Sequence, residues 1–278
     1  IVCVGYDLVE YHPYLWHPDR DRSIIHIDHS PAETDGHYPV AVGVVGDIKH
    51  SLDRIAGLTT PHQGAHVRPL RERLVKEMHQ HRDDLEFPVK PQKIIWDLRT
   101  ALDLEDIVVC DVGAHKMWMA RMFRCEYPNT CIISNGFASM GIAVPGAIAA
   151  RLVYPQRHVV AVTGDAGFMM NSQEIETAIR CKLPIVILIW NDNSYGLIEW
   201  KQKNQFQRIS NVRFNNPDFV AYAESFGARG YRVESTADLP AILEEALAND
   251  TVSIIDCPVD YRENIKLTDQ LGTLVCPT

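Results

Sequence analysis

The sequence predicts an α/β protein whose core is a parallel sheet flanked by helices. Two continuous apolar runs, Val159–Val162 and Ile185–Trp190, have the composition of strands that are buried on both faces. The segment between them places Ile175, Ala178 and Ile179 on one face of a helix. A strand, a helix and a second strand in this order are typical of a βαβ unit, so the two strands are expected to be parallel.

Residues 1–58 predict part of a second α/β domain. Two apolar runs, Ser23–Asp28 and Val40–Val45, are expected to be strands, and Ile48–Ile55 is expected to be a short helix. Residues 59–91 predict a linker, because prolines punctuate both of its ends. Within this linker, Val67–Arg82 carries apolar residues at helical spacing among many charges, which predicts a surface helix.

Residues 92–278 predict the main α/β domain. Ile94–Leu102 has a helical pattern, and Ile107–Asp111 is an apolar strand that ends in a carboxylate. A helix is expected over 221–228, where Gly227 marks its end. Strands are expected at Arg232–Ser235 and Val252–Cys257.

Each of the two central apolar runs ends in a polar cluster. Gly164-Asp165 follows the first run, and Asn191-Asp192-Asn193 follows the second. The carboxyl ends of parallel strands meet at one edge of the sheet, where α/β proteins bind their ligands. We therefore expect these clusters, which are distant in the sequence, to be neighbours in the fold.

The residues at this edge suit a diphosphate bound through Mg²⁺. Gly164, Ala166 and Gly167 are small enough for the backbone to approach a ligand closely, and N–H groups at the start of a helix suit a phosphate. Asp165 and Asp192 offer oxygen ligands, and Mg²⁺ prefers one or two carboxylates together with phosphate oxygens and water. The alternative is a doubly wound domain in which these aspartates only cap helices.

Composition excludes several classes of protein. The chain has 278 residues, 46% of them hydrophobic, and a formal net charge of −9, which argues against nucleic acid or an anionic membrane surface as the main partner. The seven cysteines are scattered without a C-x-x-C pair, as expected for reduced thiols in a cytoplasmic protein. No apolar run is long enough to span a bilayer. Because the chain starts at Ile1 in a strand-like run, we expect a fragment or a processed product.

The two polar clusters resemble the Gly-Asp-Gly … Asn-Asn signature of thiamine diphosphate enzymes. Asp165 and Asp192 are 27 positions apart (192 minus 165), which suits that family. This chain departs from the signature at Ala166 and at Asp192, and both departures resemble acetolactate synthases, the second one those of the catabolic type. The resemblance implies that Mg²⁺ is bound by the side chains of Asp165 and Asp192 and by the main-chain oxygen of Ser194.

Other segments resemble the family's cofactor-binding segments. Val112–His115 matches a stretch in which Gln is common at the position of Ala114, and His115 would donate to a phosphate unless neighbouring backbone satisfies it. In Asn135–Gly141, the resemblance makes Met140 the wedge beneath a bent cofactor and the carbonyl of Ala138 an acceptor for its amine. The alternative for Met140 is an ordinary core residue.

The segment after the second cluster resembles the part of the family that closes over the cofactor. Tyr195, Gly196 and Leu197 are expected to line the cofactor site, and Lys201 is expected to face the substrate. Biosynthetic relatives carry Trp at the position of Lys201, where it favours 2-ketobutyrate. Its absence points to pyruvate as the second substrate. Catabolic relatives usually carry Gln there, so Lys201 is a departure from them as well.

The N-terminal residues also resemble catabolic acetolactate synthases, on Gly5–Tyr11 and Ile25–Glu33, as does Pro258–Asn264 near the C-terminus. In relatives that carry flavin, the central domain holds FAD, and an acid near Asp28 would meet its ribose. We favour a domain without a cofactor, because the glycine-rich half of a nucleotide site is not in this chain.

The resemblance implies condensation of two pyruvates to 2-acetolactate and CO₂, with thiamine diphosphate and Mg²⁺ as cofactors. The activating Glu of the family lies on a pyrimidine-binding domain, which this chain does not contain, so no catalytic residue is assigned here. That domain would belong to the partner subunit of a homodimer or homotetramer. A 2-oxoacid decarboxylase, a benzaldehyde lyase and a non-catalytic subunit that keeps the fold remain the alternatives.

Overall fold

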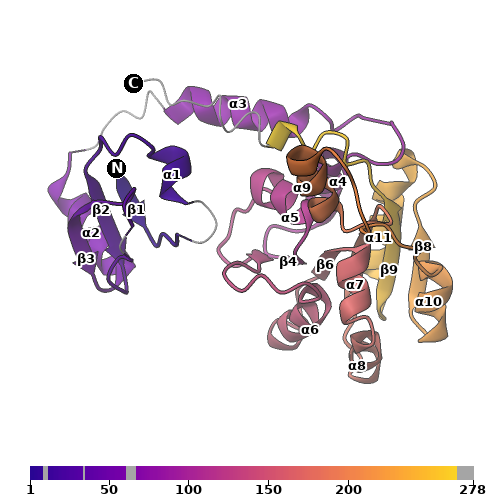
Figure 1. The fold of residues 1–278 in the computed structure, drawn as a ribbon. Helices are drawn as coiled ribbons and strands as arrows, with labels where there is room; N and C mark the ends of the chain where they lie inside the picture. Colours follow the sequence, from indigo (N-terminus) through magenta and orange to yellow (C-terminus); the bar gives the residue numbers. More distant parts are fainter. Residues whose placement is uncertain (9–11, 34, 61–66, 268–278) are drawn as a thin grey trace. The chain divides into compact units, whose positions relative to one another are not determined.

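The computed structural model describes residues 1–8, 12–33, 35–60 and 67–267, and it divides into two compact units, Ile1–Leu70 and Arg71–Thr278. The boundary between them lies inside helix α3 (Val67–His79), which falls in the segment predicted to be a linker. Figure 1 shows the elements of each unit.

The first unit is built on three parallel strands. β1 (Val2–Val4), β2 (Ile24–Asp28) and β3 (Val40–Val45) pair in the order β1-β2-β3, accompanied by α1 (Pro13–Trp16) and α2 (Ile48–Leu58). Ile24 and Ile27 of the central strand are buried, whereas several residues of the outer strands are exposed. The strands and the helix predicted for residues 23–55 are therefore present.

The second unit is built on a larger sheet whose strand order is β5-β4-β6-β7-β9-β8, with every neighbouring pair parallel. Its strands are β4 (Ile107–Cys110), β5 (Cys131–Ile133), β6 (Val159–Gly164), β7 (Val186–Asn191), β8 (Arg229–Arg232) and β9 (Ser253–Pro258). Its helices after α3 are α4 (Pro91–Ala101), α5 (Ala114–Met122), α6 (Ala143–Val153), α7 (Asp165–Met170), α8 (Glu174–Arg180), α9 (Gly196–Phe206), α10 (Phe219–Ser225) and α11 (Leu239–Ala248).

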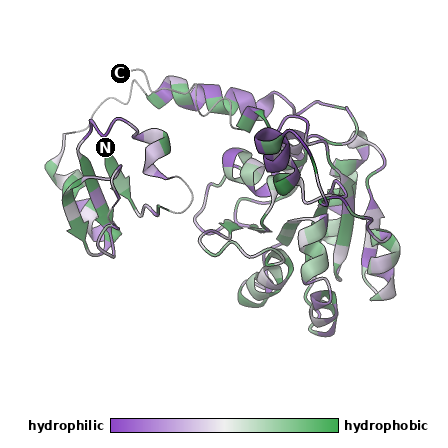
Figure 2. Cartoon of the chain, viewed as in Figure 1, coloured by the Kyte–Doolittle hydropathy of each residue, from purple (hydrophilic) through white to green (hydrophobic). Residues whose placement is uncertain are grey.

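Side-chain alternation along the strands builds a core on each face of this sheet. Val160 and Val162 of β6 pack with α4, α5 and α11, whereas Val159 and Ala161 pack on the other face with α6, α7, α8 and α10. Figure 2 shows the mostly hydrophobic colouring of the central strands. This architecture confirms the predicted α/β class, and it explains why these strands read as continuous apolar runs.

Several elements differ in position or extent from the sequence prediction. The helix expected over 221–228 lies at Phe219–Ser225. The last but one strand is Arg229–Arg232, three residues before the predicted Arg232–Ser235, because Ser235 instead forms a capping box with Asp238. Gly230 concealed this strand in the sequence, yet α10 packs so closely here that a Cβ on Gly230 would lie 2.8 Å from the backbone of Val220. The single helix expected between β6 and β7 is divided into α7 and α8.

The chain reverses its direction across the sheet between β4 and β6. After β4 it adds β5 on one side, and it then returns to add β6 on the other side. Such a reversal opens a crevice at the carboxyl ends of the two strands, which is where ligands bind in open α/β sheets. Among the described residues, no helix combines the length and the apolar character needed to cross a membrane.

Candidate functional site

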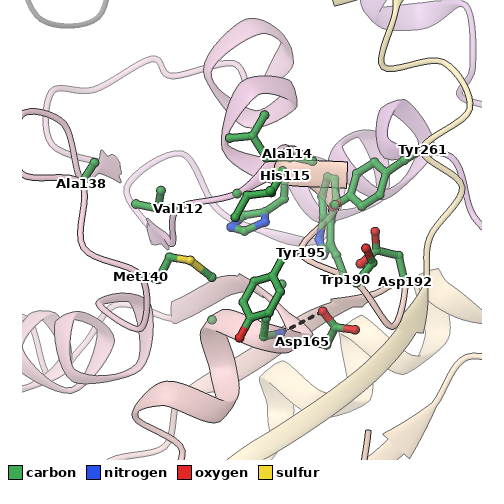
Figure 3. Close-up of a pocket in the computed structure, with 18 residues that line it drawn as sticks. Val112, Ala114, His115, Ala138, Met140, Asp165, Trp190, Asp192, Tyr195 and Tyr261 are labelled. Carbon is green, nitrogen blue, oxygen red and sulfur yellow. Dashed lines mark hydrogen bonds between the residues drawn. The ribbon is translucent and has the colours of Figure 1, made fainter. Parts of the chain in front are cut away.

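A pocket of about 260 Å³ lies at this reversal point, at the carboxyl ends of β4, β6 and β7 (Figure 3). Nearly every site residue predicted from the sequence lines it: Ala114, His115, Ala138, Met140, Gly164, Asp165, Ala166, Gly167, Asp192, Ser194, Tyr195, Gly196 and Leu197. Val112 and Gly113, from the predicted segment Val112–His115, also line the pocket, and the remaining lining residues, which were not predicted individually, are Trp190, Ile198 and Tyr261. The two polar clusters, distant in the sequence, therefore meet in one pocket.

Asp165 is the most tightly held acid of the pocket. It is only 1% exposed, at the point where β6 passes into α7. Its Oδ1 accepts from the backbone N–H of Ala166 at 2.8 Å. Its Oδ2 accepts from the backbone N–H of Asn193 and from the Asn216 amide, both at 2.7 Å. Burial raises the pKa of Asp165, and these hydrogen bonds oppose that rise because they favour the ionised carboxylate.

Asp192 lies on the loop after β7 and lines the same pocket. Burial raises its pKa to about 8, and the negative charges of Asp165 and Glu199 add to the rise. A bound divalent cation would offset both effects, because it attracts the ionised carboxylate and separates it from the charge of Asp165.

The donor set fits Mg²⁺ in the presence of a diphosphate. Within the described ranges, no group of three or more His, Cys, Asp or Glu side chains is arranged to hold a metal ion. Two carboxylates at one pocket are the number that Mg²⁺ uses when phosphate oxygens and water complete its octahedron. The pocket therefore suits a metal that arrives together with a phosphorylated ligand.

We expect Mg²⁺ binding to strengthen with rising pH. If Asp192 is a ligand of the cation, it must be ionised, and its pKa of about 8 leaves it mostly protonated at pH 6. Affinity should therefore rise by up to about ten-fold per pH unit below pH 8 and level off above it. Calorimetric titration of Mg²⁺ at saturating thiamine diphosphate measures this profile.

Asp192→Asn is the matched control for the pH profile, because an amide oxygen can bind Mg²⁺ without titrating in this range. The variant should keep its affinity for Mg²⁺, and this affinity should change much less with pH. An unchanged pH dependence in the variant would show that Asp192 does not set it.

His115 presents an unpaired ring nitrogen in this pocket. The side chain is buried, and among the described residues its Nε2 has no hydrogen-bond partner. Burial lowers the pKa of His115 to about 4, so the ring is neutral at pH 7. A Cβ on Gly113 would lie 2.7 Å from the ring, so glycine at this position makes room for it. A neutral imidazole that donates through Nε2 suits a phosphate oxygen.

The loop that carries Ala138 and Met140 is tied to the end of β4. The carboxylate of Asp111 accepts from the backbone N–H of Gly141 at 2.8 Å and from that of Ala143 at 3.2 Å. Ala138 has a φ of +49°, which is uncommon for a residue with a Cβ, and such conformations concentrate at binding sites. Asp111 thus holds Met140 and Ala138 beside the pocket (Figure 3).

The loop from Asp192 to Gly196 is held by its own set of contacts. The Ser194 hydroxyl donates to Glu199 at 2.8 Å, and Arg213 pairs with the same carboxylate at 2.8 Å. Gly196 begins α9 beside Asp192, and a Cβ on Gly196 would lie 2.5 Å from Oδ2 of Asp192, so that carboxylate would have to shift. By contrast, Lys201 on α9 is exposed and does not line the pocket.

Sequence reasoning missed three residues that shape the site. Asp111 directly follows β4 as Asp165 directly follows β6, and the sequence predicts it only as the end of a strand. Asn216 lies in a loop, 51 residues after Asp165, and no local pattern connects the two. Tyr261 follows β9, whose carboxyl end reaches the same edge of the sheet, and this placement is the signal that would have found it.

Comparison with known proteins identifies the domain that forms this pocket. Residues 111–257 match the family model described as thiamine pyrophosphate enzyme, C-terminal TPP binding domain, where thiamine pyrophosphate is another name for thiamine diphosphate. This range extends from the end of β4 to β9 and includes nearly all of the pocket.

Several curated relatives match almost the whole chain. An acetolactate synthase of Bacillus subtilis is 39% identical over 277 residues, which cover 96% of this chain and 48% of the relative. A catabolic acetolactate synthase of Raoultella terrigena is 36% identical over 278 residues, which cover 98% of this chain and 49% of the relative. A probable acetolactate synthase large subunit of Methanocaldococcus jannaschii is 31% identical, over 91% of this chain and 45% of the relative.

The chain spans about half the length of these relatives. The family model covers more than half of the chain, and its range contains β6, β7 and the acidic pair of the pocket. The chain therefore belongs to the thiamine pyrophosphate enzyme family, and residues 111–257 are its C-terminal TPP-binding domain.

Proposed function

We propose that this chain provides the diphosphate- and Mg²⁺-binding half of an acetolactate synthase-like active site, which condenses two pyruvates to 2-acetolactate and CO₂. The observation that carries this proposal is that Asp165 and Asp192 line one pocket, in a chain whose relatives include a catabolic acetolactate synthase. The site residues and their roles are part of the proposal.

In this proposal, the residues of the chain bind and orient the cofactor. The carboxylates of Asp165 and Asp192 and the main-chain oxygen of Ser194 hold Mg²⁺, and Nε2 of His115 donates to the diphosphate. When bound, thiamine diphosphate supplies the electron sink for decarboxylation and carbon–carbon bond formation. Met140 supports the cofactor from below, and the Ala138 carbonyl accepts a hydrogen bond from its amine.

The rest of the site belongs to a pyrimidine-binding domain in this proposal. That domain supplies the activating Glu, either from a longer form of the chain or from a partner chain in a homodimer or homotetramer. The relatives support it, because each is about twice as long as the matched region. We expect the 278 residues alone to bind the cofactor weakly and to form no acetolactate.

The proposed acceptor is pyruvate, because this chain has Lys201 where biosynthetic relatives carry Trp. Lys201 is exposed in the structure, so its role beside the substrate stays a prediction.

A product assay tests the proposed reaction. The complete assembly, containing this chain and its pyrimidine-binding domain, is incubated with pyruvate, thiamine diphosphate and Mg²⁺. We expect 2-acetolactate and CO₂ in equal amounts. Formation of acetaldehyde without acetolactate would contradict the proposal and indicate a 2-oxoacid decarboxylase. A lack of turnover, together with no rise in melting temperature on adding cofactor and Mg²⁺, would favour a non-catalytic subunit.

A further inference from the structure

Asn216 connects the two strand ends that carry the acidic residues of the pocket. It lies in the connection between α9 and α10. Its amide Nδ2 lies 2.7 Å from Asp165 Oδ2, 3.0 Å from Asn191 Oδ1 and 3.2 Å from Asn193 Oδ1. One amide group is thus surrounded by acceptors from the end of β6 and the end of β7.

The position of Asn216 is fixed by its neighbours in the chain. On one side, the backbone N–H of Phe214 donates to the carbonyl of Asn193 at 3.1 Å. On the other side, Asp218 caps α10 by accepting from the backbone N–H of Val220, and it pairs with Arg232 at 2.8 Å. Two anchors within two residues of Asn216 therefore hold its side chain against Asp165.

The hydrogen bonds of Asp165 are divided unequally between its two oxygens. A carboxylate oxygen has about two acceptor positions. On Oδ2, both are taken, by the N–H of Asn193 and by the amide of Asn216. Oδ1 accepts from the N–H of Ala166 at 2.8 Å, and the backbone N–H of Asp192 also interacts with this carboxylate. Because both positions on Oδ2 are filled, Oδ1 is the oxygen more open to a further ligand.

We propose that Asn216 is a positioning residue that occupies Asp165 Oδ2 and so makes Asp165 a one-oxygen ligand, through Oδ1, for the divalent cation. This inference rests on the proposed function, because it assumes that the cation binds at Asp165 and Asp192. It goes further by assigning a role to a residue outside the pocket lining. It also predicts which cation the site prefers, since Mg²⁺ demands a near-ideal octahedron whereas Ca²⁺ accepts carboxylates through one or both oxygens.

Removing the amide of Asn216 should therefore weaken the binding of Mg²⁺ more than the binding of Ca²⁺. In the complete assembly at saturating thiamine diphosphate, calorimetry gives the dissociation constant of each cation. We expect Asn216→Ala to weaken Mg²⁺ binding by about ten-fold, as is common when the hydrogen-bond partner of a metal ligand is removed. The loss for Ca²⁺ should be clearly smaller, because a freed Oδ2 allows two-oxygen binding. Asn216→Leu, which keeps the branching of the side chain at Cγ and lacks the donor, should behave in the same way.

Asn215→Ala is the matched control, because it removes the neighbouring, exposed amide and leaves the contacts of Asn216 in place. It should leave both dissociation constants unchanged. Equal losses of affinity for Mg²⁺ and Ca²⁺ in both Asn216 variants would show a merely structural role and overturn the inference. Unchanged binding of both cations would also overturn it. If the unaltered assembly binds thiamine diphosphate without any dependence on Mg²⁺, the proposed function fails and the role of Asn216 fails with it.

Discussion

Replacing Asp165 with Asn is expected to abolish the Mg²⁺-dependent binding of thiamine diphosphate. The variant removes the negative charge that attracts the cation. It also misplaces a donor, because Oδ1 and Oδ2 both accept from N–H groups and the new NH₂ must face one of them. Ligand at one hundred times its dissociation constant stabilises a protein by about 2.7 kcal/mol, and we expect the variant to lose this gain.

Thermal unfolding of the complete assembly, with and without cofactor and Mg²⁺, measures the loss. Asp53→Asn is the matched control, since Asp53 is an exposed residue of α2 in the first unit and does not line the pocket. The control should keep the full ligand-induced rise in melting temperature. A variant at Asp165 that keeps the same rise would contradict the assigned metal site.

Replacing Gly196 with Ala is expected to weaken Mg²⁺ binding severely without harming the fold. A Cβ at this position would lie 2.5 Å from Oδ2 of Asp192, so the carboxylate must move away from its place in the pocket. Gly196 is the first residue of α9, where Ala favours the helix more than Gly does. We therefore expect an unliganded melting temperature at least as high as that of the unaltered protein, combined with a large rise in the Mg²⁺ dissociation constant.

Gly57→Ala provides the comparison for this second variant. Gly57 lies within α2, and a Cβ added there would meet no atom within 4 Å. This control should keep its affinity for Mg²⁺ at saturating thiamine diphosphate, measured by calorimetry. Normal Mg²⁺ affinity in Gly196→Ala would show that the position of Asp192 does not matter for binding.

The central strands of the larger sheet could be predicted because strands that are buried on both faces have continuous apolar sequences. Val159–Val162 and Ile185–Trp190 are apolar without alternation, and their ends carry the polar clusters that reach the ligand edge. The edge strand Arg229–Arg232 is not a continuous apolar run, because it is partly exposed and contains a glycine required by close packing against α10. Its position depends on tertiary contacts, which cannot be inferred from a local sequence pattern.

The candidate site shows the same division between local and tertiary information. Asp165 and Asp192 are recognisable because each stands directly after a strand in a known spacing. The contacts of Asp111 with Gly141 and of Asn216 with Asp165 join segments 30 and 51 residues apart, so the sequence gives no reason to pair them. Both residues contact the backbone or the side chains of residues that line or adjoin the pocket.

The most direct test of the shared metal site is a crystal structure of the complete assembly with thiamine diphosphate and Mn²⁺, in which anomalous scattering locates the ion. We expect one peak at the pocket between β6 and β7, within coordination distance of a carboxylate oxygen of both Asp165 and Asp192, which is about 2.0–2.2 Å for small divalent ions. A cofactor-bound ion that neither carboxylate contacts would contradict this account of the site.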